Sequence, residues 1–315
     1  MSVILITGAA GYLGSQLGQE LMAQGHKVVG IDRVTPALDF AVFQMDIRAT
    51  ELADFMREHE VSQVVHLASI VSPGADEALE YDIDVNGTRN VLDACMSAGV
   101  KHITITSSGA AYGYHADNPD WIDESCPLRG NESFSYSRHK RLVEGLLADY
   151  RKLYPQLEQL ILRPGTILGE TTQNMITQLL TRKRLLAVKG SPSPFVFIWD
   201  QDMVNILIQG VTNRTAGIFN VAGDGALTVH DIAALTERKV MTLPAWLLRA
   251  ALWLGHGLKL SQAGPNHLLF LQYRPVLLNQ ALKENFGYTP AKSSREVFEL
   301  FWAAHGARQK GQEQP

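Results

Sequence analysis

The sequence is poor in cysteine and has no long apolar run. Its two cysteines, Cys95 and Cys126 of 315 residues, form neither a CxxC pair nor a disulfide framework, which favours a reducing compartment. The longest apolar stretch, residues 243–255, is interrupted by Arg249 and is shorter than the roughly 20 residues that span a bilayer. The N-terminus lacks a basic segment followed by a cleavable apolar run. We therefore expect a soluble, cytoplasmic protein without a transmembrane segment.

Neither sign of charge dominates the sequence. The chain carries 28 Lys and Arg against 32 Asp and Glu, a net charge of −4. Because nucleic-acid binding depends on a positively charged surface, this balance argues against a nucleic-acid partner. The ten histidines show no metal-ligand spacing such as HExxH, so we expect no metal. With 46% hydrophobic residues the chain can bury a large core, in one large or two modest globular units.

The first residues follow the order strand, glycine turn, helix, strand. An apolar run at 3–6 precedes the turn Thr7–Gly14, and residues 15–24 have helical spacing. The first glycine of such a turn permits the tight bend, the second lets the backbone approach a pyrophosphate, and the third lets helix and strand pack. The strand expected at 26–31 ends at Asp32, whose carboxylate favours NAD because it would repel a 2′-phosphate. Arg33 leaves NADP as an alternative.

Polar or small residues follow the next expected strands. A strand at 43–45 ends at Asp46-Ile47, which either borders an adenine ring or forms an ordinary loop. After a helix at 50–59, a strand at 63–67 runs into Ala68-Ser69. Ligands bind at the carboxyl edge of parallel sheets, so these residues should pass under the cofactor. We expect His66 to be a packed strand histidine rather than a catalyst.

A tyrosine and a lysine four residues apart provide the candidate catalytic pair. Tyr136 and Lys140 precede a run with helical apolar spacing, which places them one turn apart on the same helix face. An ammonium group close to a phenol favours the phenolate, which suits a general acid/base acting on a hydroxyl or carbonyl group. After a long helix at 77–98, the strand expected at 102–106 leads to Ser107 and Ser108. Ser108 is the better candidate to bind the same substrate oxygen.

In this order and spacing, Thr7–Gly14, Asp32, Asp84–Val91, Thr106–Gly113 and Tyr136…Lys140 resemble the extended short-chain dehydrogenase/reductases, also called the NAD-dependent epimerase/dehydratase family. The resemblance extends to about residue 235. It implies an α/β fold: a Rossmann-type doubly wound parallel sheet with a smaller, mostly helical C-terminal substrate domain. The NAD(P)-binding domain would comprise 1–164 and about 194–222, and the substrate domain about 165–193 and 223–305. Residues 306–315 would be a disordered tail.

The resemblance also assigns roles to residues. Ser108, Tyr136 and Lys140 would be catalytic, and Ser108, Thr166 and Asn174 would bind the substrate. The expected cofactor contacts are Gly8, Gly11, Tyr12, Leu13, Gly14, Asp32, Arg33, Asp46, Ile47, Leu67, Ala68, Ser69, Asn86, Thr106, Ser107, Tyr136, Lys140, Arg163 and Pro164. We also expect a homodimer that acts on a small molecule.

Departures from the family pattern bear on the substrate, whose identity the sequence leaves open. Dehydratases carry Asp-Glu directly after the catalytic hydroxyl, where this chain has Gly109-Ala110. Nucleotide-sugar epimerases usually have Arg-Asp, which grips the diphosphate, where this chain has Phe195-Val196. They also favour Tyr-Phe-Asn where Pro164-Gly165-Thr166 stands here. Asn174-Met175 does resemble their Asn-Leu-Met, and an arginine elsewhere (Arg182, Arg184 or Arg274) can meet a phosphate.

These observations favour net hydride transfer at a secondary alcohol or ketone over the alternative, a UDP-glucose 4-epimerase-like activity. A more remote alternative is a regulator that senses NAD(P) without turnover. The apolar stretch 243–254 fits a core helix, a dimer face, a lid over a hydrophobic substrate, or a segment that contacts a membrane surface.

Overall fold

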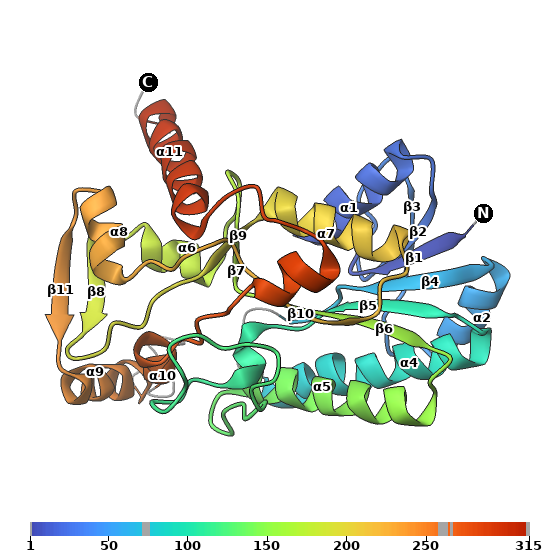
Figure 1. Ribbon diagram of the computed structural model, residues 1–315, viewed down its shortest axis with the longest axis horizontal. Coiled ribbons are helices and arrows are strands. Elements are labelled where there is room, and N and C mark those ends of the chain that lie inside the picture. Colours follow the sequence, from blue (N-terminus) through green and yellow to red (C-terminus); the bar gives the residue numbers. More distant parts are fainter. Residues whose placement is uncertain (1, 71–75, 258–263, 265–266, 313–315) are drawn as a thin grey trace. The chain divides into compact units, whose positions relative to one another are not determined.

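The computed structural model describes residues 2–70, 76–257, 264 and 267–312 (Figure 1). The chain forms two compact units. The first contains residues 1–111, 139–163 and 204–219, and the second contains 112–138, 164–203 and 220–315.

The first unit is built on a seven-stranded sheet in the order β10-β6-β5-β4-β1-β2-β3, and its pairings from β6 to β3 are parallel. The expected Rossmann-type doubly wound fold is therefore confirmed. The strands are β1 (Val3–Thr7), β2 (Lys27–Asp32), β3 (Ala41–Gln44), β4 (Val61–His66), β5 (His102–Thr106), β6 (Glu158–Pro164) and β10 (Gly217–Val221). The helices that lie wholly or mostly in this unit are α1 (Tyr12–Ala23), α2 (Leu52–Glu58), α3 (Glu77–Tyr81), the π-helical turn η1 (Asp82–Asn86), α4 (Gly87–Ala98), the 3₁₀ turn η2 (Gly109–Tyr112), α5 (Ser135–Leu153) and α7 (Asp200–Thr212).

The central strands are apolar because helices cover both of their faces. Every residue of β1 is buried. On one face, Leu5, Val64 and Ile103 pack with side chains of α2, α4 and α5, including Leu92 and Leu147. Figure 1 shows α1 and α7 on the opposite face of the sheet. The resulting core holds the carboxyl ends of the strands in fixed register, and most of the candidate site residues lie there.

The helix expected at 77–98 is interrupted by the π-helical turn η1. Both acidic side chains of this turn are held by neighbouring segments. The carboxylate of Asp84 accepts the Ile70 N–H at 2.9 Å, and Asp82 pairs with Arg48 at 2.7 Å. Such turns are frequent at functional sites. The sequence predicts one continuous helix here, because a π-helical turn lies within the helical run and does not end it.

The second unit contains two small parallel sheets, β8 with β11 and β7 with β9. Phe195, Phe197, Phe298 and Phe301 lie in its main core. Its elements are β7 (Thr166–Leu168), α6 (Met175–Leu180), β8 (Arg184–Val188), β9 (Phe197–Trp199), α8 (Val229–Leu235), β11 (Lys239–Leu243), α9 (Ala245–Gly257), α10 (His267–Gln272), the π-helical turn η3 (Leu282–Phe286) and α11 (Ser294–Gln312).

Two segments about which the sequence makes predictions, the C-terminal tail and the apolar stretch 243–254, lie in this unit. The tail expected from residue 306 begins within α11, which continues to Gln312, and residues 313–315 lie outside the described residues. The apolar stretch 243–254 forms the end of β11 and most of α9. Among the described helices, none is both long and apolar enough to cross a membrane.

Candidate active site

The turn between β1 and α1 has room only for glycine at two of its positions. Gly8 has φ +72°, and a Cβ there would lie 2.8 Å from the Ala68 backbone nitrogen. A Cβ on Gly14 would lie 2.2 Å from the Gly8 carbonyl oxygen. Tyr12 and Leu13 form the first turn of α1, and no described side chain caps that helix at Gly11. The turn and the amino end of α1 therefore form a backbone cradle suited to a phosphate group.

Asp32 is the last residue of β2, and its carboxylate is hydrogen-bonded to the backbone of this cradle. Its carboxylate accepts the Ala10 N–H at 3.0 Å and the Val34 N–H at 3.3 Å. Arg33 beside it is exposed. Asp32 therefore lies against the glycine turn, as the sequence predicts for a ribose-binding acid.

Asp46 and Ile47 follow β3 and are each engaged within the first unit. Arg48 donates to both carboxylate oxygens of Asp46, at 2.8 and 2.7 Å. These hydrogen bonds lower the pKa of Asp46. Ile47 is buried, and its side chain fills the space beside Gly87. If Asp46 lies beside the adenine ring of a bound cofactor, it does so while paired with Arg48.

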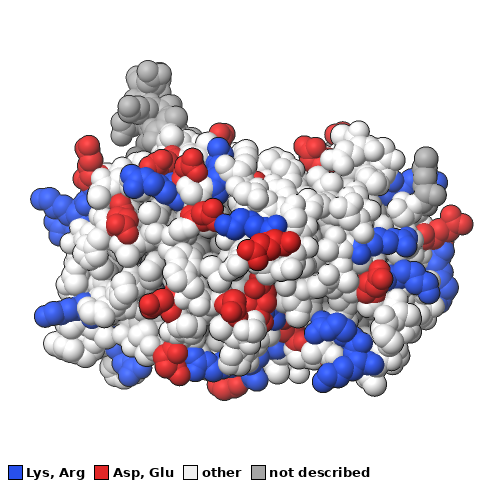
Figure 2. All heavy atoms as spheres, viewed as in Figure 1, with Lys and Arg blue, Asp and Glu red and all other residues white. Residues whose placement is uncertain are grey.

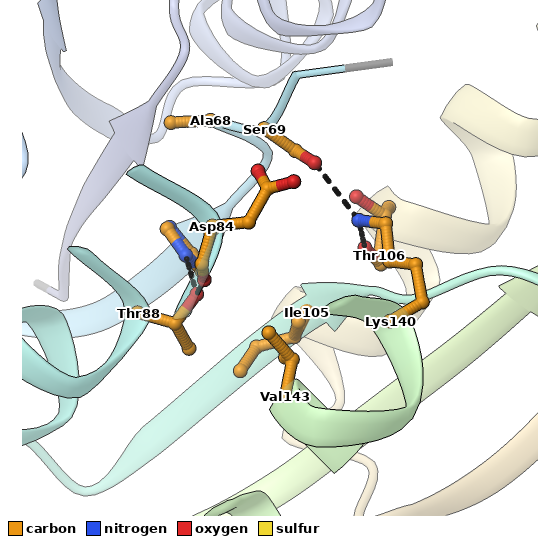
Figure 3. A pocket seen from close by; sticks show the side chains of 9 residues that line it. Ala68, Ser69, Asp84, Thr88, Ile105, Thr106, Lys140 and Val143 are labelled. Carbon is orange, nitrogen blue, oxygen red and sulfur yellow. Dashed lines mark hydrogen bonds between the residues drawn. The ribbon is translucent and has the colours of Figure 1, made fainter. Parts of the chain in front are cut away.

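A small cavity is lined by the ends of β4 and β5 and by the buried Lys140 (Figure 3). The Lys140 ammonium donates to Ser69 Oγ at 3.0 Å and to the Thr106 carbonyl at 3.5 Å. The side chains of Ala68 and Asp84 line the same cavity. The structure thus brings together three residues that the family resemblance assigns to the cofactor: Ser69, Thr106 and Lys140. Leu67 lies two residues before Ser69.

His66 is packed, as the sequence predicted. It is 3% exposed, and its ring nitrogens lie 2.7 Å from Thr7 Oγ1 and 3.0 Å from Thr88 Oγ1. Burial, together with the nearby charge of Lys140, lowers the pKa of His66 to about 3. The ring is therefore neutral at working pH and ties β1 and β4 to α4.

Glu144 is a site residue that the sequence analysis did not single out. It lies on α5, one turn after Lys140, and receives hydrogen bonds from Arg163 Nε at 2.7 Å and Nη2 at 2.6 Å and from Ser107 Oγ at 2.6 Å. The Arg163 and Glu144 side chains are only 4% and 3% exposed. Its four-residue spacing from Lys140 is the signal that would have found it.

This pair separates the two candidate serines. The Ser107 hydroxyl donates its proton to Glu144. The Ser108 oxygen instead accepts the Ala110 N–H at 3.1 Å at the start of η2. The Ser108 proton is therefore available in this arrangement for another acceptor, such as a substrate oxygen. Tyr136 lies in the first turn of α5, four residues before Lys140.

The remaining candidates have local roles in the described structure. Asn86 donates to Asp82 at 2.8 Å at the end of η1. Pro164 ends β6, and the Thr166 N–H donates to the Val196 carbonyl in the β7–β9 region. The Asn174 side-chain oxygen caps α6 by accepting the Thr177 N–H at 2.9 Å. Asn174, which we expect to bind the substrate, therefore already uses its side-chain oxygen to cap a helix.

An arginine in the second unit lies against Phe195. The Arg274 guanidinium is 3.6 Å from the centre of the Phe195 ring and donates to the Ser193 and Phe270 carbonyls. Burial lowers the pKa of Arg274 to about 9. Arg274 and Arg182 border a mostly apolar cavity in this unit. Position 195 therefore lacks an arginine of its own, and another part of the chain supplies a guanidinium there.

Comparison with known proteins supports the resemblance. The model of the NAD dependent epimerase/dehydratase family matches residues 4–222, more than half of the chain. The chain belongs to this family. The match covers β1 through β10, and so it includes the glycine turn, the strand ends and the helix that carries Tyr136 and Lys140.

Relatives within the epimerase/dehydratase family differ in how much they share with this chain. An uncharacterized protein of Mycobacterium tuberculosis is 24% identical over 96% of this chain and 84% of its own length. A UDP-glucose 4-epimerase of Erwinia amylovora is 32% identical over 51% of this chain and 52% of its own length. The chain thus spans about half of that epimerase.

Solved structures show the same fold. A short-chain dehydrogenase/reductase superfamily protein of Agrobacterium tumefaciens with bound NAD has a TM-score of 0.77 at 22% identity, covering 99% of this chain and 100% of that one. The UDP-glucose 4-epimerase of Thermotoga maritima with UDP-glucose has a TM-score of 0.75 at 18% identity, covering 98% and 99%. At such identities the likeness concerns the fold alone.

Proposed function

We propose that this chain is an NAD-dependent enzyme that transfers a hydride at a secondary alcohol or ketone and releases an oxidised or reduced product. The observation that carries the proposal is the fixed position of Lys140. Its ammonium is held by Ser69 and Thr106 at the carboxyl edge of the sheet, and the same helix presents Tyr136 one turn earlier.

The residues of the first unit fit NAD. The glycine cradle and the amino end of α1 suit the pyrophosphate. Asp32, already at the glycine turn, would accept the adenine ribose hydroxyls. A structural neighbour is described with bound NAD. When bound, the nicotinamide ring supplies the hydride acceptor or donor.

Each catalytic residue has a separate task. In oxidation Tyr136 would accept the proton of the substrate hydroxyl, while bound NAD would supply the hydride acceptor. Ser108 would donate a hydrogen bond to the substrate oxygen, which fits its free proton beside Ala110. Lys140 would bind the nicotinamide ribose and place a positive charge one helical turn from Tyr136. In reduction the same steps run in reverse.

Replacing Tyr136 by Phe tests this assignment. The variant removes only the phenolic hydroxyl, so it should lose most of kcat while NAD titration gives nearly the same affinity. Turnover is followed by nicotinamide absorbance with secondary alcohols and ketones. Unchanged turnover would defeat the assignment. If no substrate ever changes the absorbance and the variant keeps the biological effect, the protein is an NAD-sensing regulator.

A second candidate is a nucleotide-sugar 4-epimerase, in which NAD stays bound and the hydride returns to the substrate. It is favoured by the guanidinium of Arg274 at Phe195, where family epimerases carry their own arginine. Arg274 uses three N–H groups on carbonyls, and a guanidinium has five, so two can meet a diphosphate. The relatives named UDP-glucose 4-epimerase point the same way.

Mass spectrometry of the freshly purified protein separates these two activities. Net oxidoreduction requires exchange of NAD in every turnover, so little cofactor should remain bound after purification. Retained NAD together with tight UDP binding would favour the epimerase. Arg274→Gln should then weaken UDP binding, while Arg295→Gln on α11, whose side chain is 61% exposed, serves as the matched control. Light scattering of the same sample tests the expected homodimer.

A further inference from the structure

Helix α9 presents an apolar stripe to the solvent. Trp246 is 71% exposed, Trp253 66% and Leu254 54%. Trp246 and Trp253 are seven residues apart, so they lie almost on one line along the helix. The opposite face is buried, where Leu248 packs with Val188 and Leu268. The stripe is therefore a second apolar face that the described core does not use.

Positive charge accompanies this stripe. Arg249 is exposed on α9, one turn after Trp246 and one turn before Trp253. Lys189 is exposed too, and its N–H donates to the Leu243 carbonyl, two residues before α9 begins. In Figure 2 the lower left edge, where Figure 1 draws α9 with the ends of β8 and β11, shows white and blue side chains.

The segments that pack around α9 contain no acidic residue. α9 rests on β8 and α10. The segment 171–199, which includes α6 and β8, has four Lys or Arg and no Asp or Glu. The segment 238–283, which includes β11, α9 and α10, has six Lys or Arg and no Asp or Glu. Lys283 pairs with Asp224 at 2.8 Å. The remaining cations of these segments give this part of the second unit a positive field, although the net charge of the chain is −4.

The cations differ in their distance from the stripe. Arg184 and Lys239 are register partners at the start of β8 and β11, and the strands place them roughly 15 Å from the end that adjoins α9. They contribute mainly to long-range attraction, which salt screens over about 10 Å. The acids nearest in sequence, Asp231 and Glu237, belong to α8 and the turn after it. Arg249 and Lys189 are the cations next to the stripe.

We propose that α9 docks on an anionic lipid surface, with Trp246, Trp253 and Leu254 inserted at the level of the headgroups. Tryptophan favours this interface because its ring is apolar and its N–H remains hydrogen-bonded. An apolar stripe flanked by cations is the pattern of an interfacial helix.

The geometry favours lipid over two other occupants. The two tryptophans expose on the order of 350 Å², if a whole side chain offers about 250 Å², whereas a stable dimer covers about 800 Å² on each partner. Nucleic acid requires several cations along the contact surface, and α9 offers only Arg249 among its described residues.

Vesicle binding tests the proposal. The full chain is sedimented with phosphatidylcholine vesicles, with or without phosphatidylglycerol. We expect binding to the anionic vesicles, a blue shift of tryptophan fluorescence, and weaker binding at high salt. Trp246→Ala/Trp253→Ala should lower the partition coefficient more than tenfold, and Arg249→Glu should lower it for anionic vesicles only. Trp121→Ala, which removes another exposed tryptophan of the second unit, should bind like the unchanged chain.

Any of the following results would overturn the proposal: no binding to anionic vesicles, equal loss of binding in the Trp121 variant, self-association that the double Trp variant abolishes, or nucleic-acid binding that depends on the same tryptophans. Tryptophans shielded from acrylamide in the free protein would also overturn it, because the chain itself would then cover the stripe. Circular dichroism confirms that each variant is folded.

Discussion

Replacing Glu144 by Gln should destabilise the first unit strongly. Glu144 receives two hydrogen bonds from Arg163 and one from Ser107. Glutamine has nearly the same volume but no charge, so the buried Arg163 cation would lose the carboxylate that two of its N–H groups contact. Breaking one side of such a buried pair costs about 3–5 kcal/mol. The side chains are 4% and 3% exposed, so solvent screens little of this effect.

The assay is urea unfolding followed by circular dichroism. Arg163→Met should cost a similar amount, since it leaves the carboxylate unpaired. Glu144→Met/Arg163→Met should cost less than either single change, because no charge is then buried alone. The matched control is Glu299→Gln, which breaks the Arg295–Glu299 pair on α11, whose side chains are 61% and 48% exposed. That change should cost less than about 0.5 kcal/mol.

Two results would refute this reasoning. If Glu144→Gln costs no more than the exposed control, the buried pair does not stabilise the fold. If the double variant loses the sum of the two single losses, the residues act independently and the penalty does not come from an unpaired charge.

Three further predictions concern the first unit. Gly14→Ala should abolish NAD binding in titration calorimetry, because its Cβ would lie 2.2 Å from the Gly8 carbonyl oxygen. The control Gly145→Ala on α5, where a Cβ would have nothing within 4 Å, should instead raise the free energy of unfolding by about 0.5–1 kcal/mol. If both variants change NAD affinity equally, the glycine turn is not the phosphate cradle. Asp32→Ala should narrow the preference for NAD over NADP, and a preference for NADP in the unchanged protein would overturn this. The pKa of His66 is lowered to about 3 in the folded protein, so the unfolded chain binds a proton at this residue first as the pH falls below about 6.5. The free energy of unfolding should therefore drop by up to about 1.4 kcal/mol per pH unit. His66→Gln should reduce that slope in urea titrations at pH 5–7.

The sequence by itself determined the local elements, the family and the edge of the sheet at which the candidate residues lie. Apolar spacing and glycine positions act over a few residues, so the strand–turn–helix unit at β1–α1 and the Tyr136–Lys140 spacing were readable without coordinates. The family model confirmed the family, and the seven-stranded sheet confirmed the fold. The residue roles at the site remain predictions.

Tertiary structure decided which polar groups satisfy one another. Glu144, Arg163 and Ser107 come from α5, β6 and the end of β5, and only the packing of these elements brings the three side chains into hydrogen-bond distance. This contact commits the Ser107 proton, leaving Ser108 as the better candidate to meet a substrate.

Tertiary structure also decided which side of the apolar stretch 243–254 is buried and which is exposed. A helix with apolar residues on every side is compatible with a position in a core, in a lid or at a surface, because the period of the pattern does not say what packs against the helix. β8 and α10 cover the Leu248 side, and Trp246 and Trp253 remain exposed. Burial depends on the area that neighbouring elements offer, and these neighbours come from distant parts of the chain.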